Sequence, residues 1–222
     1  MKKLLLAFLI SFVAAQTNAQ QWISLFDGKT TKGWHSFGKA SAGEAWKVED
    51  GAIVFDPAAK ASGKYGGDIV TNEGFNDFHL QLEWKISKNG NSGIIFFVQD
   101  NPTKYQETWH TGPEMQVLDN DGHEDGKIIS HRAGNLYDLI VGKEGVVKPY
   151  DQWNKVDIIF KKGQLDLILN DVSMVSTHVG DDGWKELIRR SKFAAGESPD
   201  FAKIFSRHIA LQDHGNKVSY RN

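Results

Sequence analysis

The chain has 222 residues, of which 40% are hydrophobic and 24% charged, so it can form one sizeable globular core. Its formal net charge is -2 and no basic run stands out, which makes nucleic acid and anionic membranes poor partner candidates. There is no cysteine, which excludes disulfides and a cysteine nucleophile.

The first element of the chain is a short hydrophobic segment with a basic start. Lys2 and Lys3 precede the apolar run Leu4–Ala15, and small residues allow cleavage after Ala15 or Ala19. This pattern is typical of a secretory signal peptide. A membrane anchor is the alternative, but the run is short for a bilayer span. We therefore expect residues 1–19 to be removed, 20–222 to form one domain without membrane contact, and the protein to be secreted into a bacterial periplasm or the extracellular space.

Short strands follow at near-regular spacing. Residues Phe78–Ile86 alternate apolar and polar side chains, which predicts a half-buried antiparallel strand. Ile94–Val98 is apolar on both faces, as in a strand inside a sandwich. Asp50-Gly51 and Asn170-Asp171 mark the turns of two hairpins. Further strands are predicted at Asp68–Thr71, Leu136–Val141, Lys155–Lys161, His208–His214 and Val218–Arg221, the last of which is either a short edge strand or lacks a continuation.

Helical signals are rare beyond the N-terminal segment. Trp184–Ser191 is short and amphipathic and is the one good helical candidate, whereas Ala58–Gly67 is predicted to be a loop. Roughly a dozen strands without a βαβ rhythm indicate an all-β fold. We predict an antiparallel two-sheet jelly-roll sandwich with one short helix.

One predicted strand carries polar side chains where a core strand would be apolar. It lies at the start of Thr111–Gly126, where Glu114 and Gln116 are two residues apart and so point the same way, about 6.6 Å apart. Met115 and Val117 would then point into the core. The polar pair is either part of a functional face or an ordinary solvated strand surface.

The predicted strand at His208–His214 has the same character. Gln212 and His214 share a face, and the alternating Ile209 and Leu211 take the other. If the apolar pair faces the core, Gln212 and His214 face the same surface as Glu114. A histidine also has a suitable pKa for proton transfer near neutrality.

The loop after Glu114 is rich in oxygen ligands. Asp119, Asp121 and His123, with Asp125 beyond them, could bind a divalent metal such as calcium, although the histidine favours a transition metal. The spacing does not fit an EF-hand, and a polar turn is the alternative interpretation.

Several sequence blocks, taken together and in order, resemble one family. WISLFDGKTTKGW, NSGIIFFV, GPEMQVLDN, HRAGNLYDL, QWNKVDI and HIALQDHG resemble the 3-keto-disaccharide hydrolase domain family, from about Trp22 to Asn222. The resemblance implies a concanavalin A-like lectin/glucanase jelly roll with its site on the concave face of a sheet. It also implies cleavage of glycosides whose sugar carries a ketone at C3.

Such a ketone acidifies the hydrogen on C2, so cleavage can proceed by elimination and hydration or as net hydrolysis. The site then needs a base, an acid and a donor at the ketone oxygen. Glu114, His131 and His214 are the predicted catalytic residues. The predicted substrate-binding residues are Gln116, Tyr137, Gln212, Trp109 and His110, with Tyr105 completing an aromatic platform for the sugar.

Two other functions stay open at this stage. Glu114 and Asp119 could act as a two-carboxylate glycosidase pair, but only if a bulge brings them to one face. Alternatively, the domain could be a carbohydrate-binding module without catalysis, because the same fold serves lectins. The absence of G-x-S-x-G, P-loop and HExxH motifs argues against serine hydrolase and nucleotide chemistry.

Overall fold

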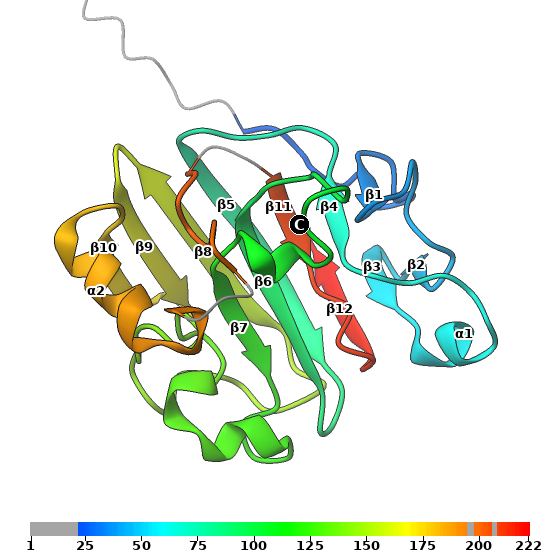
Figure 1. The fold of residues 1–222 in the computed structure, drawn as a ribbon. Coiled ribbons are helices and arrows are strands. Elements are labelled where there is room, and N and C mark those ends of the chain that lie inside the picture. The colour runs from blue at the N-terminus through cyan, green and yellow to red at the C-terminus, as the bar shows by residue number, and fades with distance from the viewer. Residues whose placement is uncertain (1–21, 195–197, 206–207) are drawn as a thin grey trace, which may run out of the picture.

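The protein is a sandwich of two antiparallel sheets (Figure 1). This computed structural model describes residues 22–194, 198–205 and 208–222. The predicted signal peptide, residues 1–19, lies outside the described residues. Among the residues that are described, no helix has the length and apolar character that a bilayer span requires.

The larger sheet has seven strands. The two predicted hairpins are confirmed: Asp50 and Gly51, and likewise Asn170 and Asp171, all have positive φ, as a two-residue hairpin turn requires. The last strand, β12 (Val218–Arg221), lies inside this sheet, between β5 (Phe78–Ile86) and β3 (Ala52–Phe55), and not at an edge. The spatial order is β10 (Val172–His178), β9 (Gln164–Leu169), β8 (Asn154–Lys161), β5 (Phe78–Ile86), β12 (Val218–Arg221), β3 (Ala52–Phe55) and β2 (Trp46–Glu49).

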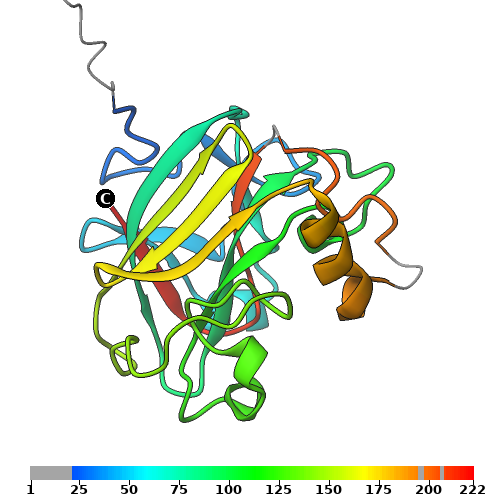
Figure 2. The same cartoon turned by 90° about the vertical axis from the view of Figure 1, so that its left-hand side faces the viewer.

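The smaller sheet has five strands and carries the polar strand at one edge. Its order is β1 (Trp34–Ser36), β4 (Ile69–Thr71), β11 (His208–Leu211), β6 (Asn91–Val98) and β7 (Glu114–Leu118). Figure 2 shows the two layers, with the yellow strands β8 to β10 in one and the green strands β6 and β7 in the other. The predicted jelly-roll sandwich is confirmed.

The main core lies between the sheets. The alternation in β5 buries Leu80, Leu82, Trp84 and Ile86, as predicted. The small sheet contributes Ile94, Met115, Val117, Ile209 and Leu211 from its inner face. Because strand side chains alternate, the residues between these point to the outer face of the small sheet, and that face positions the site.

A β-bulge in β6 enlarges this core. His208 pairs with Val98 and Ala210 with Ile95, so β6 has one more residue than β11 over this interval. Phe97 takes a positive φ of 62° at this point. Phe96 and Phe97 therefore both enter the core, where their rings meet edge to face with centroids 5.0 Å apart.

Three local predictions need correction. Ala58–Gly67 is not all loop, because Asp56 caps a short helix α1 (Pro57–Ala61) that has proline in its first turn. Helix α2 (Asp182–Arg190) forms as predicted but is therefore not the only α-helix. Leu136–Val141 is not a strand, since Leu136 makes only isolated bridges to Met115 and Ile140. The described residues also form four short 3₁₀ helices: η1 (Thr108–His110), η2 (Glu124–Lys127), η3 (Ile129–His131) and η4 (Lys192–Ala194).

Candidate active site

The two polar residues of β7 lie on the outer face of the five-stranded sheet. Met115 and Val117 belong to the core between the sheets, which confirms the predicted alternation. Glu114 and Gln116 are not solvated, however: they are only 8% and 1% exposed. A carboxylic acid at such a depth is costly in its charged form, so its surroundings decide its chemistry.

Glycine in the neighbouring strand makes the space for Glu114. Gly93 in β6 pairs with Gln116, and a Cβ atom at position 93 would overlap the Glu114 carboxyl group. The Glu114 side chain therefore lies across the sheet, over the backbone of β6. A larger residue at position 93 would push the carboxyl group out of this place.

The environment of Glu114 is apolar on one side. Ile95, which pairs with Glu114, forms a small outer-face cluster with Val70, Val98 and Ala210, and the half-buried Trp109 packs against it. No hydrogen bond from a described residue reaches the Glu114 carboxyl group. Burial raises the pKa of Glu114 from 4.5 to about 8, and the negative charge of Asp68 adds to the shift.

Asp68 is a second buried acid near the same face. Its carboxylate accepts hydrogen bonds from the Thr108 hydroxyl and from the Asp213 N–H, the latter at 2.8 Å. Burial raises its pKa to about 6, against the opposing effect of these two bonds. Asp68 is fully engaged by protein groups, whereas Glu114 is free to meet a ligand.

A loop covers the free edge of β7 and brings further side chains to Glu114. The Tyr137 N–H donates to the Glu114 carbonyl at 2.9 Å, and the Gln116 N–H donates to the Asn135 carbonyl at 3.1 Å. The Gly134 N–H donates to the Gln116 carbonyl at 2.9 Å. These bonds pair the backbone groups at the free edge of β7 and fix the loop 131–138 beside the buried acid.

Within this loop, three polar side chains form a hydrogen-bonded chain. The Tyr137 hydroxyl lies 3.2 Å from His131 Nδ1, and His131 Nε2 lies 3.3 Å from an oxygen of Asp138. The two rings also pack, with centroids 4.3 Å apart. If His131 carries its proton on Nε2, then Nδ1 accepts from Tyr137 while Nε2 donates to Asp138.

Lys192 from η4 reaches the same tyrosine. Its Nζ donates to the Tyr137 hydroxyl at 3.1 Å and lies 4.2 Å from the centre of the ring. The backbone N–H of Lys192 donates to Asp138 at 2.9 Å, so one carboxylate orients both His131 and Lys192. The positive charge of Lys192 lowers the pKa of Glu114 and so partly opposes the effect of burial.

Tyr137 stays protonated in this setting. Partial burial, followed by the negative charges of Asp125, Glu114 and Asp138, raises the pKa of its hydroxyl far above the ordinary value. The hydroxyl is thus a proton donor at neutral pH. Loss of that proton would require the ammonium group of Lys192 to stabilise the phenolate.

Gln212 borders Gly93 from the other side. Its N–H donates to the Gly93 carbonyl at 3.0 Å, and its carbonyl accepts from the Ser92 hydroxyl at 2.7 Å. Its side-chain oxygen Oε1 is buried and has no partner among the described residues. Glu114, Gln116 and Gln212 therefore surround one glycine, and a buried acceptor without a partner is ready for a donor from a ligand.

His214 lies beyond the end of β11, which stops at Leu211. Its side chain is exposed, and its ring centroid is 6.0 Å from that of His123. Partial desolvation, then the neighbouring His123, lowers its pKa. The predicted catalytic roles of Glu114, His131 and His214 remain predictions.

The predicted metal ligands do not come together. Asp119 is buried, and its carboxylate accepts from the Asn89 N–H at 2.8 Å, while His123 accepts from the Asp125 N–H at 3.1 Å. Asp121 is exposed. Among the described residues, no group of three or more His, Asp or Glu side chains has the arrangement of a metal site. Asp119 and His123 instead accept backbone hydrogen bonds, and the ligand set Asp119, Asp121 and His123 stays a prediction.

The predicted aromatic platform forms only in part. Trp109 and His110 are half-buried neighbours in η1, with ring centroids 4.3 Å apart. Tyr105 is buried, and its hydroxyl donates to Asp200 at 2.7 Å, so it anchors the loop instead. The half-buried Trp109, which packs against the outer-face cluster, can offer part of its ring to a sugar.

Two contributors were missed by the sequence analysis. Lys192 follows α2 in a segment without any strand pattern, so no local signal connects it to Glu114. Asp68 stands between Gly67 and the apolar Ile69, and an acid directly before a buried strand was the one available sign.

The sequence of residues 21–222 matches the model of the 3-keto-α-glucoside-1,2-lyase-like domain. This protein belongs to that family. A 3-keto-disaccharide hydrolase of Bacteroides thetaiotaomicron is 34% identical over 225 residues, which span 92% of this chain and 78% of the relative. The resemblance predicted from the sequence is confirmed.

Solved structures agree with this family membership. A presumed glycosyl hydrolase of Parabacteroides distasonis is 33% identical and covers 89% of each chain with a TM-score of 0.79. Another protein of that organism, 20% identical, covers 85% of this chain and 96% of its own with a TM-score of 0.61, and shows the shared fold. The family and its relatives identify the protein as a glycoside hydrolase, which confirms the predicted enzyme class.

Replacement of Glu114 by glutamine should stabilise the protein in alkaline solution. The pKa of Glu114 is higher in the folded than in the unfolded chain, so the stability of the wild type falls as the pH rises from 4.5 through about 8. The Glu114→Gln variant has no charge to bury there. We expect its stability relative to the wild type to grow between pH 5 and pH 9, by on the order of a few kcal/mol of unfolding free energy. The melting temperature of the variant should therefore rise relative to that of the wild type.

Thermal unfolding of both proteins across this pH range measures the effect. Glu73→Gln, at an exposed position, is the matched control and should follow the wild type. A constant difference between Glu114→Gln and the wild type at all pH values would show that Glu114 ionises normally.

Proposed function

We propose that this glycoside hydrolase cleaves glycosides whose sugar ring carries a ketone at C3, such as 3-keto-disaccharides. The observation that carries the proposal is the buried Glu114 with a pKa of about 8, whose carboxyl group bonds no described residue, in a site with a tyrosine, a lysine and a histidine. An acid–base pair of this kind suits proton abstraction next to a carbonyl group. The relative from Bacteroides thetaiotaomicron, named a 3-keto-disaccharide hydrolase, supports the same substrate class.

The proposed reaction has two stages. A base takes the proton from C2, and the electron pair forms an enolate with the C3 oxygen. The C1–O bond then breaks, the ketone re-forms, and a double bond joins C1 and C2 while the leaving oxygen takes up a proton. Water adds its oxygen to C1 and a proton returns to C2, so the net change is hydrolysis.

Glu114 is the proposed base. Its ionised form is destabilised by burial, which makes it a stronger base than an exposed carboxylate, and no described group competes for its lone pairs. A base with a pKa close to the working pH combines reactivity with a sufficient ionised fraction. In the second stage, the neutral acid returns its proton to C2.

Tyr137 is the proposed acid at the leaving oxygen. Its raised pKa keeps the hydroxyl protonated until the bond breaks, and the Lys192 ammonium group at 3.1 Å stabilises the phenolate that results. His131 orients the hydroxyl, and Asp138 is a positioning residue for both His131 and Lys192. The water that adds to C1 restores the proton of Tyr137.

The remaining residues are proposed to bind the sugar. The amides of Gln116 and Gln212 flank Gly93 and can bond hydroxyl groups, with the unpartnered Oε1 of Gln212 as an acceptor. Trp109 offers an apolar surface for a sugar face. The exposed His214 with His123 lies at the outer border, where a second sugar unit would lie.

Export of the protein is proposed on the sequence alone. The basic Lys2-Lys3 start and the apolar run Leu4–Ala15 support it. The proposed destination is the periplasm.

A 3-keto-disaccharide should be cleaved, and the same disaccharide with its C3 hydroxyl intact should not, because only the ketone acidifies H2. Released reducing sugar, followed by chromatography, measures both reactions. Glu114→Gln should lose activity by at least about 10²-fold while it stays folded. Binding of the 3-keto-disaccharide without turnover would favour the carbohydrate-binding alternative, and equal cleavage of both sugars would exclude the elimination route.

Replacement of Lys192 by methionine should lower kcat by about 10²–10³-fold, because an electrostatic stabiliser of developing negative charge is lost. Lys192 is an exposed residue, so the melting temperature should change little. Lys185→Met, on the exposed side of α2, is the matched control. Lys192→Arg should restore part of the rate. An unchanged kcat in Lys192→Met would remove Lys192 from the mechanism.

A further inference from the structure

The side chains on the outer face of the small sheet lie in rows that cross the strands. The registers of β4 with β11, β11 with β6 and β6 with β7 place Val70, Ala210, Ile95 and Glu114 in one row. The first three belong to the apolar outer-face cluster. The Glu114 side chain leaves this row, because its carboxyl group occupies the space over Gly93.

The row that receives the Glu114 carboxyl group is polar. The same registers, carried one residue further, place Asp68, Gln212, Gly93 and Gln116 side by side. Two strand spacings, or about 10 Å, separate Asp68 from Gly93. Asp68 is thus a second buried acid in line with the carboxyl group of Glu114.

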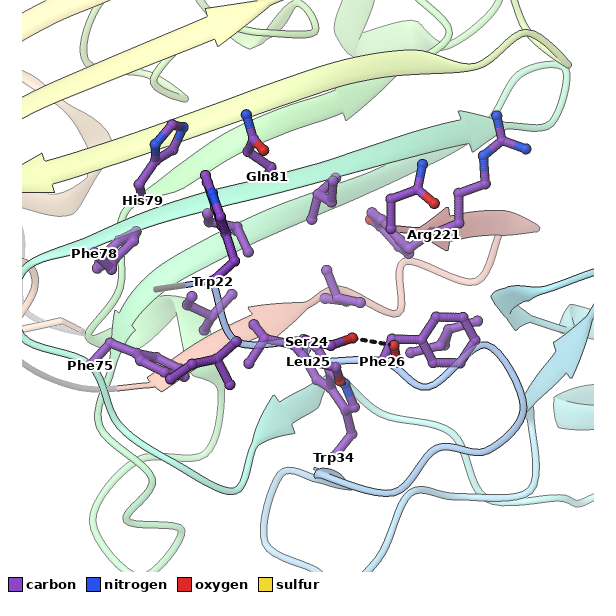
Figure 3. Close-up of a pocket in the computed structure, with 18 of the residues that line it drawn as sticks. Trp22, Ser24, Leu25, Phe26, Trp34, Phe75, Phe78, His79, Gln81 and Arg221 are labelled. Atoms are coloured by element: carbon purple, nitrogen blue, oxygen red, sulfur yellow. Dashed lines mark hydrogen bonds between the residues drawn. The ribbon is translucent and has the colours of Figure 1, made fainter. Parts of the chain in front are cut away.

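The inward-facing residues of β11 take no part in this row. Ile209 and Leu211 point between the two sheets and line a cavity of about 640 Å³ (Figure 3). Because alternate residues of a strand point to opposite faces, the sheet itself separates this cavity from Gln212 and Asp68. The polar row therefore belongs only to the face that carries Glu114.

The Asp68 carboxylate fixes the segment that carries Gln212. The ladder between β4 and β11 stops one residue short of this pair. Beyond it, one oxygen of Asp68 accepts from the Asp213 N–H at 2.8 Å, and the Asp213 carboxylate accepts from the Gly67 N–H at 2.8 Å. These reciprocal bonds continue the pairing of the two segments through side chains, so they hold Gln212 beside Gly93.

The other oxygen of Asp68 fixes the segment that carries Trp109. It accepts from the hydroxyl of Thr108, a buried residue that opens η1 and directly precedes Trp109. The Thr108 carbonyl in turn accepts from the Gly112 N–H at 3.2 Å, two residues before Glu114. One carboxylate therefore connects β4, η1 and the segment after β11.

The charge of Asp68 has no cation beside it. Lys60, from the end of α1, bonds the Asp213 carboxylate at 2.6 Å and not Asp68. The charges of Glu107 and Asp213 are both negative and disfavour ionisation of Asp68, as burial does more strongly. Because burial raises its pKa to about 6, Asp68 is ionised at neutral pH.

Asp68 is also the strongest of the charges that act on Glu114. Its negative charge raises the pKa of Glu114, after the larger effect of burial. The positive charge of Lys192 lowers this pKa, and the charge of Asp125 raises it less than that of Asp68. The position of Asp68 in the polar row explains its effect, because a buried separation of about 10 Å screens two charges weakly.

We propose that Asp68 is a positioning residue of this hydrolase: its carboxylate holds the segments of Gln212 and Trp109 in place, and its negative charge makes Glu114 a stronger base. Asp68 is only 9% exposed and both of its oxygens bond the protein, so it acts through other residues. The inference rests on the proposed function in that Glu114 is the base.

Replacement of Asp68 by asparagine isolates the effect of the charge. The amide oxygen can accept from the Asp213 N–H, and the amide nitrogen can donate to the Thr108 hydroxyl, so both connections remain. We expect the Glu114 carboxyl group to titrate at a pH lower by on the order of one pH unit than in the wild type. Carbon-13 NMR of the full chain measures this titration, with the signal assigned by its absence from Glu114→Gln.

The matched control for this charge is Asp50→Asn. Asp50 is exposed in the hairpin turn before Gly51, where asparagine is equally suitable. Its replacement removes one negative charge from the other sheet and should leave the titration of Glu114 unchanged.

Replacement of Thr108 by valine isolates the connection to η1. The variant keeps the charge of Asp68 but loses the hydroxyl donor. We expect the amides of residues 110–112 to exchange with solvent at least tenfold faster than in the wild type. Thr108→Ser retains a hydroxyl group and should restore the slow exchange.

Either of two results would overturn the proposal. In one, Glu114 titrates at the same pH in Asp68→Asn as in the wild type. In the other, exchange at residues 110–112 is equally fast in Thr108→Val and Thr108→Ser. With a 3-keto-disaccharide, the rising limb of kcat/KM should move to lower pH in Asp68→Asn together with the carboxyl titration. A wild type that leaves this sugar intact would contradict the proposed function alone, because both NMR measurements need no substrate.

Discussion

The placement of one carboxyl group, that of Glu114, governs the functional face of this protein. The group lies over Gly93 because no side chain occupies that position of β6, and it is dehydrated by the small apolar cluster around Ile95 and Trp109. Burial without a hydrogen-bond partner disfavours the charged form of an acid. The fold thus buries the Glu114 carboxyl group, at a cost in stability when it is charged, in the site where the proposed reaction uses a base of raised pKa.

The same strand edge links folding to chemistry. β7 lies at the margin of the five-stranded sheet, and its outer backbone groups are satisfied by the loop 134–137 instead of another strand. This pairing brings Tyr137, and with it His131, next to Glu114. Asp138 accepts a hydrogen bond from the backbone N–H of Lys192, which follows α2. Two segments more than 50 residues apart in sequence therefore meet near Glu114.

The sequence predicted what strand periodicity controls. Glu114, Gln116 and Gln212 share the outer face because alternate residues share a face, and the hairpins follow from their turn residues. Periodicity does not describe loops. Asp119 and His123, two of the predicted metal ligands, accept backbone hydrogen bonds that the spacing did not indicate. Leu136–Val141 was predicted as a strand, but Leu136 makes only isolated bridges. Lys192 and Asp68 reach the site through tertiary packing, which a local pattern does not encode.

The central claim is that Glu114 is a base with a pKa near 8, and the pH dependence of kcat/KM on a 3-keto-disaccharide tests it most directly. Because the base must be ionised, the rate constant should rise with pH along a limb whose apparent pKa is about 8. That limb should be absent from the residual activity of Glu114→Gln. A rate constant that falls as the pH rises through 8 would contradict the claim, because Glu114 would then act in its protonated form.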